Sequence, residues 1–240
     1  MVSSEAIEQW LSLQPTNIRK GIRFDSAETV GPLYHMSLDG NIPAFIPFVT
    51  RRASSKENIS IPRVSVAPTI AGCFIGYMGS WADISHPDVK NKKHKNGWYL
   101  YQIPYEYCIT PDTKLLFDQK NSDERWLVTY SPETRKYPAE IVAKMFYASM
   151  TIVPKTGDYP EYRARLLIEV LAGHSVKLGG DRTLEAGSWS VEGIVLEDHN
   201  KWHDLSKYDI RPISYGEYAK HKGLSADMLS RNPPPAAFKW

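Results

Sequence analysis

The chain has 240 residues, of which 42% are hydrophobic and 23% are charged, and its 29 basic and 27 acidic side chains give a formal net charge of +2. This composition is that of a globular protein and excludes wholesale disorder, a collagen-like repeat and a coiled coil. The small net charge gives no sign of a membrane-surface protein. The longest nearly apolar stretch, 64–78, is too short and too interrupted to cross a bilayer, so we expect no membrane contact.

The two cysteines, Cys73 and Cys108, are too few for a disulfide framework and lack the spacing of metal ligands. The N-terminal residues show no basic segment followed by an apolar one, as a secretory signal would. Both observations predict a cytoplasmic, reducing environment.

The first half of the chain mixes helices and strands. In chain order we expect a helix over 3–13, a strand over 30–37, a long loop over 41–61, a strand over 62–67, a helix from Pro68, a basic loop over 86–97, and strands over 98–104 and 125–130. The first helix follows from the helical spacing of Ile7, Trp10 and Leu11. The second begins at a proline, which suits a first helical turn.

The second half is predicted to continue this mixture. We expect a helix over 138–150, a helix over 160–172, a Gly-rich loop over 178–188, a strand over 189–197 and an irregular, Pro-rich tail from Pro212. Ile141, Met145 and Ala148 share one face of the first of these helices. Because no βαβ alternation is present, the predicted class is α+β.

A cluster of Pro, Gly and Asp over 151–160 predicts the domain organisation. We expect residues 1–155 to form a core. We expect residues 156–240 to form a C-terminal α/β elaboration packed on that core. His199 and His203 stand four apart, but no Glu-bearing metal motif accompanies them, so no metal site is predicted.

Aromatic side chains with a polar group are abundant, with 7 Trp and 14 Tyr against 7 Phe. Such side chains suit half-wet surfaces and ligand clefts, and they also pack at the rim of a core. The composition therefore leaves open a Tyr/Trp-rich binding surface.

Three segments carry a recognisable set of residues: LYHMS over 33–37, IPRVSVAPTIAGCFIGYM over 61–78 and SDERWLVTY over 122–130. In this order they resemble the ADP-ribosyltransferase superfamily of the His-Tyr-Glu kind. In that superfamily the first strand carries a Tyr-His-x-Ser/Thr motif. A strand followed by a helix with an aromatic residue comes next, and a glutamate begins a later strand. The resemblance covers about residues 30–150 and implies a compact mixed-sheet core of that family.

The resemblance also implies roles for individual residues. His35 takes the position that binds the NAD ribose, and Tyr77 takes the position that stacks on nicotinamide. The implied NAD-binding residues are Tyr34, His35, Ser37, Ser65, Thr69 and Tyr77. Glu124 takes the catalytic position, with Glu185 and Glu192 as alternatives near the strand over 189–197. We expect Glu124 to be exposed in a cleft, on a strand next to the strand of His35.

The chemistry explains why these residue types are wanted. Loss of nicotinamide from NAD builds positive charge on the ribose, and a preorganised carboxylate stabilises that charge. The sequence thus predicts a mono-ADP-ribosyltransferase, a kind of glycosyltransferase, that takes NAD as substrate and modifies a protein or nucleic acid. The alternatives are a non-catalytic binding module, such as a viral or phage accessory or inhibitor protein, and an assembly component.

Overall fold

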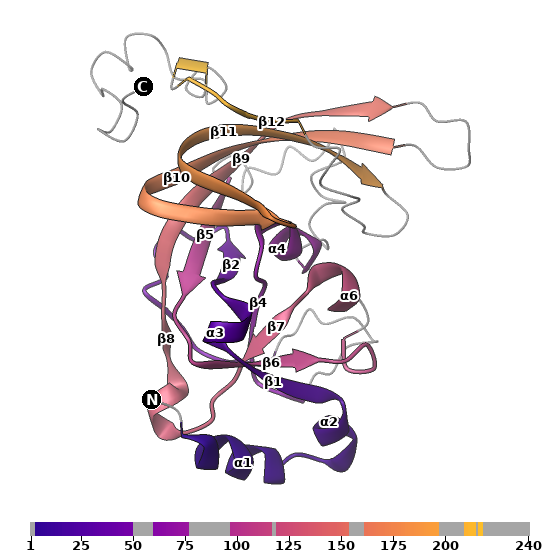
Figure 1. The fold of residues 1–240 in the computed structure, drawn as a ribbon, viewed down its shortest axis with the longest axis vertical. Coiled ribbons are helices and arrows are strands. Elements are labelled where there is room, and N and C mark those ends of the chain that lie inside the picture. Colours follow the sequence, from indigo (N-terminus) through magenta and orange to yellow (C-terminus); the bar gives the residue numbers. More distant parts are fainter. Residues whose placement is uncertain are drawn as a thin grey trace. The chain divides into compact units, whose positions relative to one another are not determined.

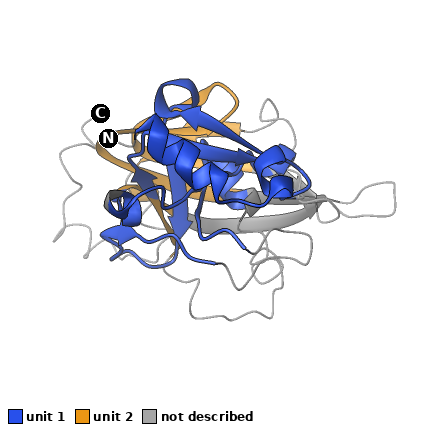
Figure 2. Cartoon of the chain, turned by 90° about the horizontal axis from the view of Figure 1, so that it is seen from below, with its two compact units in different colours: residues 1–76, 101–140 blue, residues 77–100, 141–240 orange. Residues whose placement is uncertain are grey.

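The computed structural model describes residues 3–49, 60–76, 97–116, 119–153, 161–196, 209–214 and 216–217. The chain divides into two compact units (Figure 2). Unit 1 contains residues 1–76 and 101–140, and unit 2 contains residues 77–100 and 141–240. Helices and mostly antiparallel strands occur together, which confirms the α+β class (Figure 1).

Unit 1 begins with short helices. Helix α1 (Ser4–Ser12) confirms the first predicted helix, and the Ser3 hydroxyl caps it by accepting a 3.2 Å hydrogen bond from the Ala6 amide. Helix α2 (Thr16–Lys20) starts directly after Pro15, and α3 (Ala27–Val30) is a single turn. Ile7 and Ile18 turn the apolar faces of α1 and α2 into the core.

The main sheet of unit 1 has four antiparallel strands in the order β1-β6-β7-β4. Their bounds are Ile22–Ser26 for β1, Tyr107–Pro111 for β6, Arg125–Leu127 for β7 and Val64–Val66 for β4. The strands predicted over 62–67 and 125–130 contain β4 and β7 and are confirmed. The sequence analysis missed β1 and β6, although Ile22 and Phe24 alternate with Arg23 and Asp25 as a half-buried strand requires.

Strand β2 (Leu33–Ser37) is not part of this sheet, but an isolated bridge between Tyr34 and Ala67 joins it to the residue after β4. The amide of Tyr34 donates to the carbonyl of Ala67 at 2.8 Å, and the amide of Ala67 donates back at 2.9 Å. The segment after β2 is more ordered than the loop predicted over 41–61, because β3 (Ala44–Phe45) pairs with β8 (Tyr137–Pro138). Residues 50–59 of that predicted loop lie outside the described residues.

Unit 1 also contains two short helices, and one strand contains residues of both units. Helix α6 (Gln119–Ser122) precedes β7, and the 3-10 helix η3 (Pro132–Arg135) precedes β8. Strand β5 (Trp98–Ile103) confirms the predicted strand over 98–104, and its residues fall on both sides of the division between units.

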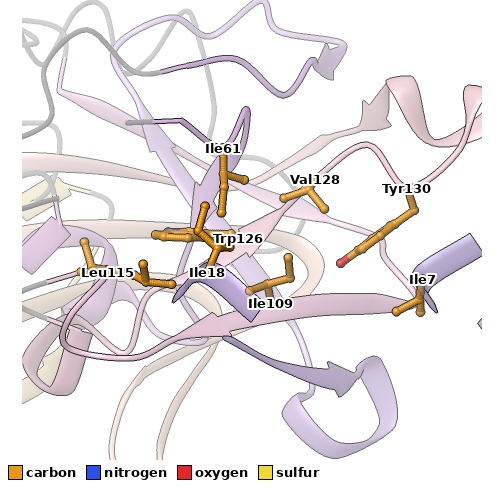
Figure 3. Packing of buried hydrophobic residues seen from close by; sticks show 9 residues of the cluster. Ile7, Ile18, Ile61, Ile109, Leu115, Trp126, Val128 and Tyr130 are labelled. Carbon is orange, nitrogen blue, oxygen red and sulfur yellow. The ribbon is translucent and has the colours of Figure 1, made fainter. Parts of the chain in front are cut away.

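One cluster of buried hydrophobic residues in unit 1 surrounds Trp126 of the main sheet (Figure 3). It contains Ile7, Ile18, Ile61, Ile109, Leu115, Leu116, Trp126, Val128 and Tyr130. The indole of Trp126 is fully buried at the middle of this cluster. Burial of apolar area at about 25 cal/mol per Å² is the main source of stability in such a cluster.

The described residues of unit 2 include three long strands and one short strand, all antiparallel, in the order β12-β11-β10-β9 (Figure 1). These are β9 (Glu140–Val153), β10 (Glu161–Gly179), β11 (Arg182–Leu196) and β12 (Asp209–Pro212). The helices predicted over 138–150 and 160–172 are therefore wrong, because both segments are strands. The strand predicted over 189–197 is confirmed. The Gly-rich loop predicted over 178–188 is wrong for most of its length, because only residues 180–181 form a turn and the rest belongs to β10 and β11.

The sequence of β10 explains the error. Its residues Leu166, Leu167 and Ile168 are consecutive and all buried, as in a strand covered on both faces. Its Leu, Glu, Arg and Ala residues favour helix locally. Pairing with β9 on one side and β11 on the other overrides that preference.

The hairpin between β10 and β11 turns at Gly180, whose φ of 54° lies in the region that favours glycine. The predicted domain boundary over 151–160 falls within unit 2, and its residues 154–160 lie outside the described residues. In the described part of the chain, no helix is both long and apolar enough to cross a membrane.

Candidate functional site

The second motif forms a strand-to-helix junction. Strand β4 ends at Val66, and helix α4 (Ile70–Gly76) begins four residues later. The Thr69 hydroxyl accepts a 3.0 Å hydrogen bond from the Gly72 amide and so caps α4. The predicted helix from Pro68 is confirmed at its start. Tyr77, the expected stacking residue, lies outside the described residues.

The first motif places a histidine against this junction. His35 Nδ1 lies 2.8 Å from the carbonyl oxygen of Ser65 in β4. Because a carbonyl oxygen only accepts, Nδ1 carries the hydrogen and the neutral ring keeps Nε2 as an acceptor. The Phe45 ring packs against the imidazole with ring centroids 4.5 Å apart. The ring orientation is therefore fixed from two sides.

Burial lowers the pKa of His35 below its ordinary value of 6.5, and the hydrogen bond to Ser65 opposes this effect. The unfolded chain therefore takes up a proton at a higher pH than the folded chain does. The contribution of His35 to the free energy of unfolding is therefore fully present above pH 6.5, and it is lost as the pH falls toward the folded-state pKa.

We predict that the loss of stability at low pH that His35 causes is absent in His35→Asn, whose amide can still donate to Ser65 but does not titrate. The difference in free energy of unfolding between the wild type and His35→Asn should narrow as the pH falls below 6.5, by at most ~1.4 kcal/mol per pH unit. Urea unfolding at four pH values from 8 to 5 measures it. A difference that stays constant over this range would contradict the buried, neutral imidazole.

The other residues of the first motif have structural contacts. The Tyr34 side chain is only 1% exposed, and its carbonyl accepts a 3.3 Å hydrogen bond from the Cys73 thiol. The Ser37 hydroxyl accepts a 3.1 Å hydrogen bond from the Asp39 amide at the end of β2. Both residues therefore help to hold the strand that carries His35.

The third motif begins with a tight loop before β7. Asp123 has a φ of 51°, and the Ser122 hydroxyl accepts a 3.3 Å hydrogen bond from the Glu124 amide. The expectation that Glu124 is exposed is wrong, because only 9% of the residue is exposed. Its Oε1 accepts a 2.9 Å hydrogen bond from the Nε1 of Trp126. An internal donor thus replaces water at this carboxylate.

The three motifs meet at β4. Ser65 pairs with Trp126 and Val66 with Arg125, while Ala67 pairs with Tyr34 on the other side. The sequence predicts that the strands of His35 and Glu124 are neighbours. In the structure β2 and β7 do not pair with each other, and only the Tyr34–Ala67 bridge joins β2 to the residue after β4. Burial raises the pKa of the Cys73 thiol to about 12, and the Glu124 charge adds to this effect.

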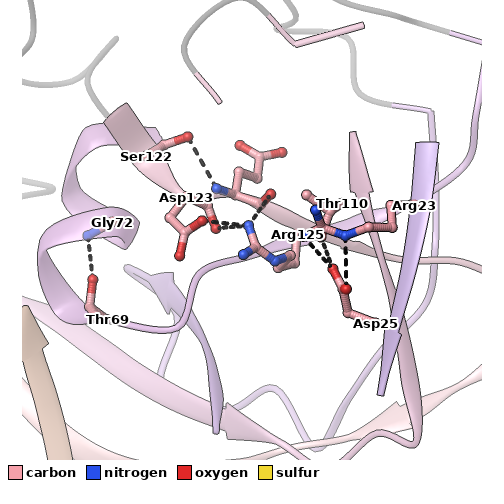
Figure 4. A network of polar contacts seen from close by, with 9 residues as sticks. Arg23, Asp25, Thr69, Gly72, Thr110, Ser122, Asp123 and Arg125 are labelled. Atoms are coloured by element: carbon pink, nitrogen blue, oxygen red, sulfur yellow. Dashed lines mark hydrogen bonds and ion pairs between the residues drawn. The ribbon is translucent and has the colours of Figure 1, made fainter. Parts of the chain in front are cut away.

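The loop before β7 is held by a polar network (Figure 4). Arg125 Nη1 lies 2.6 Å from the Asp123 carboxylate and also donates to the Asp123 carbonyl at 2.9 Å. Beside it, Asp25 accepts hydrogen bonds from Arg23 and from Thr110. Burial raises the pKa of Asp25, but these hydrogen bonds outweigh it and the pKa is lowered. The network fixes the backbone from which Glu124 projects.

The alternative glutamates lie elsewhere. Glu185 and Glu192 are both on β11 in unit 2, and neither lies on β2, β4 or β7, the strands of the three motifs. Glu192 forms a 2.9 Å ion pair with Arg165 of β10. His199, His203 and the basic run over 90–95 lie outside the described residues.

Aromatic residues of the described segments are mostly internal. Trp98 and Trp126 are at most 1% exposed, and Tyr34, Tyr101, Tyr130 and Tyr137 are also buried. The large hydrophobic side chains that are exposed are instead aliphatic or Phe, at Leu13, Ile46, Phe48 and Val49. The described aromatic residues thus serve mainly in the core. Comparisons of the chain with models of protein families, with curated proteins and with solved structures found no match.

Proposed function

We propose that the protein transfers ADP-ribose from NAD to a macromolecular acceptor, a protein or a nucleic acid. One observation carries this proposal: the three motif segments lie side by side in unit 1, because β7 pairs with β4 and an isolated bridge between Tyr34 and Ala67 joins β2 to the residue after β4. His35 and Glu124 are 89 positions apart in sequence, so this arrangement follows from tertiary structure and not from local geometry.

The contacts of His35 fit a role in binding a ribose. Its Nδ1 is committed to the Ser65 carbonyl, so its Nε2 is available to accept a hydrogen bond from a sugar hydroxyl. A neutral imidazole on a strand gives this acceptor a fixed direction, since side chains on strands are held more precisely than those on loops.

Glu124 would stabilise the positive charge that develops on the ribose as the bond to nicotinamide breaks. The bond between ribose C1′ and the nicotinamide nitrogen is cleaved, and its electron pair returns to the ring to give neutral nicotinamide. An acceptor nucleophile then bonds to C1′ and releases its proton to solvent. A fixed carboxylate beside the ribose stabilises the positive charge that develops between these events.

Incubation of the purified full chain with NAD tests the proposal through two readouts. Nicotinamide release measures cleavage, and radiolabelled NAD followed by protease or nuclease digestion identifies the class of acceptor. NAD at 100 times its Kd should also stabilise the folded chain by ~2.7 kcal/mol. Absence of both a thermal shift and nicotinamide release at millimolar NAD would reject the proposal and favour a non-catalytic binding module.

A further inference from the structure

The hydrogen bond between Trp126 and Glu124 joins a core residue to the proposed catalytic carboxylate. Trp126 is 0% exposed and Glu124 is 9% exposed, and 2.9 Å separates Nε1 from Oε1. Glu124 directly precedes β7, and Trp126 is the second residue of that strand. The indole N–H thus faces the carboxylate directly.

The indole itself is held firmly. The guanidinium of Arg63 lies over its ring, with Cζ 4.3 Å from the centroid. Arg63 is 2% exposed, and its backbone exchanges hydrogen bonds of 2.9 and 3.2 Å with Phe48. The indole also packs in the apolar cluster that contains Ile109 and Ile61 (Figure 3). The donor that meets Glu124 therefore has little rotational freedom.

We propose that Trp126 is a positioning residue that fixes the orientation and charged state of the Glu124 carboxylate. This inference rests on the proposed function for its catalytic consequence. Two physical effects follow from the hydrogen bond. A hydrogen-bond donor stabilises the negative charge of a carboxylate. It also fixes the plane of the carboxylate before substrate binds, so no reorganisation is needed as charge develops.

Trp126→Phe tests this role because it keeps an aromatic ring for Arg63 and the core but lacks the N–H. We expect kcat for nicotinamide release to fall about 10-fold with KM changed by less than twofold. We expect the acidic limb of the pH profile of kcat to move to higher pH, since a carboxylate that loses a donor is protonated more readily. A purely structural role would lower the amount of folded enzyme without moving this limb.

Trp98→Phe is the matched control, because it makes the same chemical change at another tryptophan that is 1% exposed. It should leave both kcat and the pH profile unchanged. If Trp126→Phe does not fold, benzothienylalanine at position 126 replaces the indole N–H by sulfur at nearly the same shape. An unchanged kcat and an unmoved acidic limb in a folded N–H-deficient variant would overturn the proposal.

A second readout separates this inference from the proposed function. Carbon-13 NMR follows protonation of the Glu124 carboxyl without any substrate, and Glu124→Gln identifies its signal. If the wild type does not cleave NAD but the protonation midpoint rises in Trp126→Phe, the proposed function fails and the control of Glu124 by Trp126 stands. If the midpoint does not move, the inference fails whether or not the chain cleaves NAD.

Discussion

Glu124→Gln is expected to lower NAD cleavage at least ~100-fold, a rise in the activation barrier of at least ~2.7 kcal/mol, while NAD affinity changes little. The substitution keeps the size of the side chain and removes the charge that stabilises the transition state. The amide oxygen that replaces the carboxylate can still accept the hydrogen bond from Trp126 Nε1, so the buried donor keeps a partner. We therefore expect a change in the free energy of unfolding of no more than about 1 kcal/mol.

Glu192→Gln is the control for this experiment. Glu192 lies on β11 of unit 2, and its carboxylate accepts from Arg165 at 2.9 Å, a contact that an amide oxygen can also accept. Loss of such a half-exposed ion pair costs at most about 1 kcal/mol of stability. Activity measured as nicotinamide release should be unchanged. Loss of activity in Glu192→Gln together with retention in Glu124→Gln would place the catalytic role on β11 instead of at the start of β7.

The motif-bearing strands could be predicted because their local signals agree with the tertiary structure. Strand β2 combines buried Leu33 and Met36 with a following Asp-Gly turn, and β4 is a short apolar run before a proline. Helix α4 has a hydroxyl cap at Thr69 directly before its first residue. Local propensity and the fold agree at these positions, which is the condition for reliable prediction.

Strands β9 and β10 of unit 2 could not be predicted in the same way. The segment 140–150 places Ile141 and Met145 four residues apart, as a helix would. Its conformation is decided by pairing with β10, whose residues follow it by about 20 positions. Strand β10 pairs in turn with β11. Such non-local pairing leaves little trace in a window of ten residues.

The burial of Glu124 was also outside the reach of local reasoning. A charged residue after Ser122 and Asp123 has the appearance of a surface turn. The donor that makes its burial tolerable is Trp126, two residues later, and a buried indole N–H normally finds a partner. The pattern Glu-x-Trp at the start of a strand is the signal that could have indicated this pair.

The second large effect is expected at the contact between α4 and the loop before Glu124. A Cβ on Gly72 would lie closer than 3.0 Å to the carbonyl oxygen of Ser122 and 2.9 Å from the Cβ of Ala67. Both neighbours are held, since Ala67 exchanges two backbone hydrogen bonds with Tyr34 and the Ser122 hydroxyl accepts from the Glu124 amide. The glycine thus permits the close approach of the second motif to the third.

Gly72→Ala should therefore destabilise the protein, although the same change in a helix interior normally stabilises by ~1 kcal/mol. Overpacking against backbone that cannot yield costs about 1–3 kcal/mol, and we expect this cost to exceed the gain in helix propensity. Urea unfolding measures the net change, and Gly216→Ala is the control, since its nearest neighbour lies at 3.9 Å. Because Ser122 immediately precedes the Asp123-Glu124 loop, the displacement should also lower kcat for nicotinamide release in the protein that remains folded. A stabilised Gly72→Ala variant with full activity would show that α4 and this loop move apart without consequence, and would remove the packing basis for joining the second and third motifs in one site.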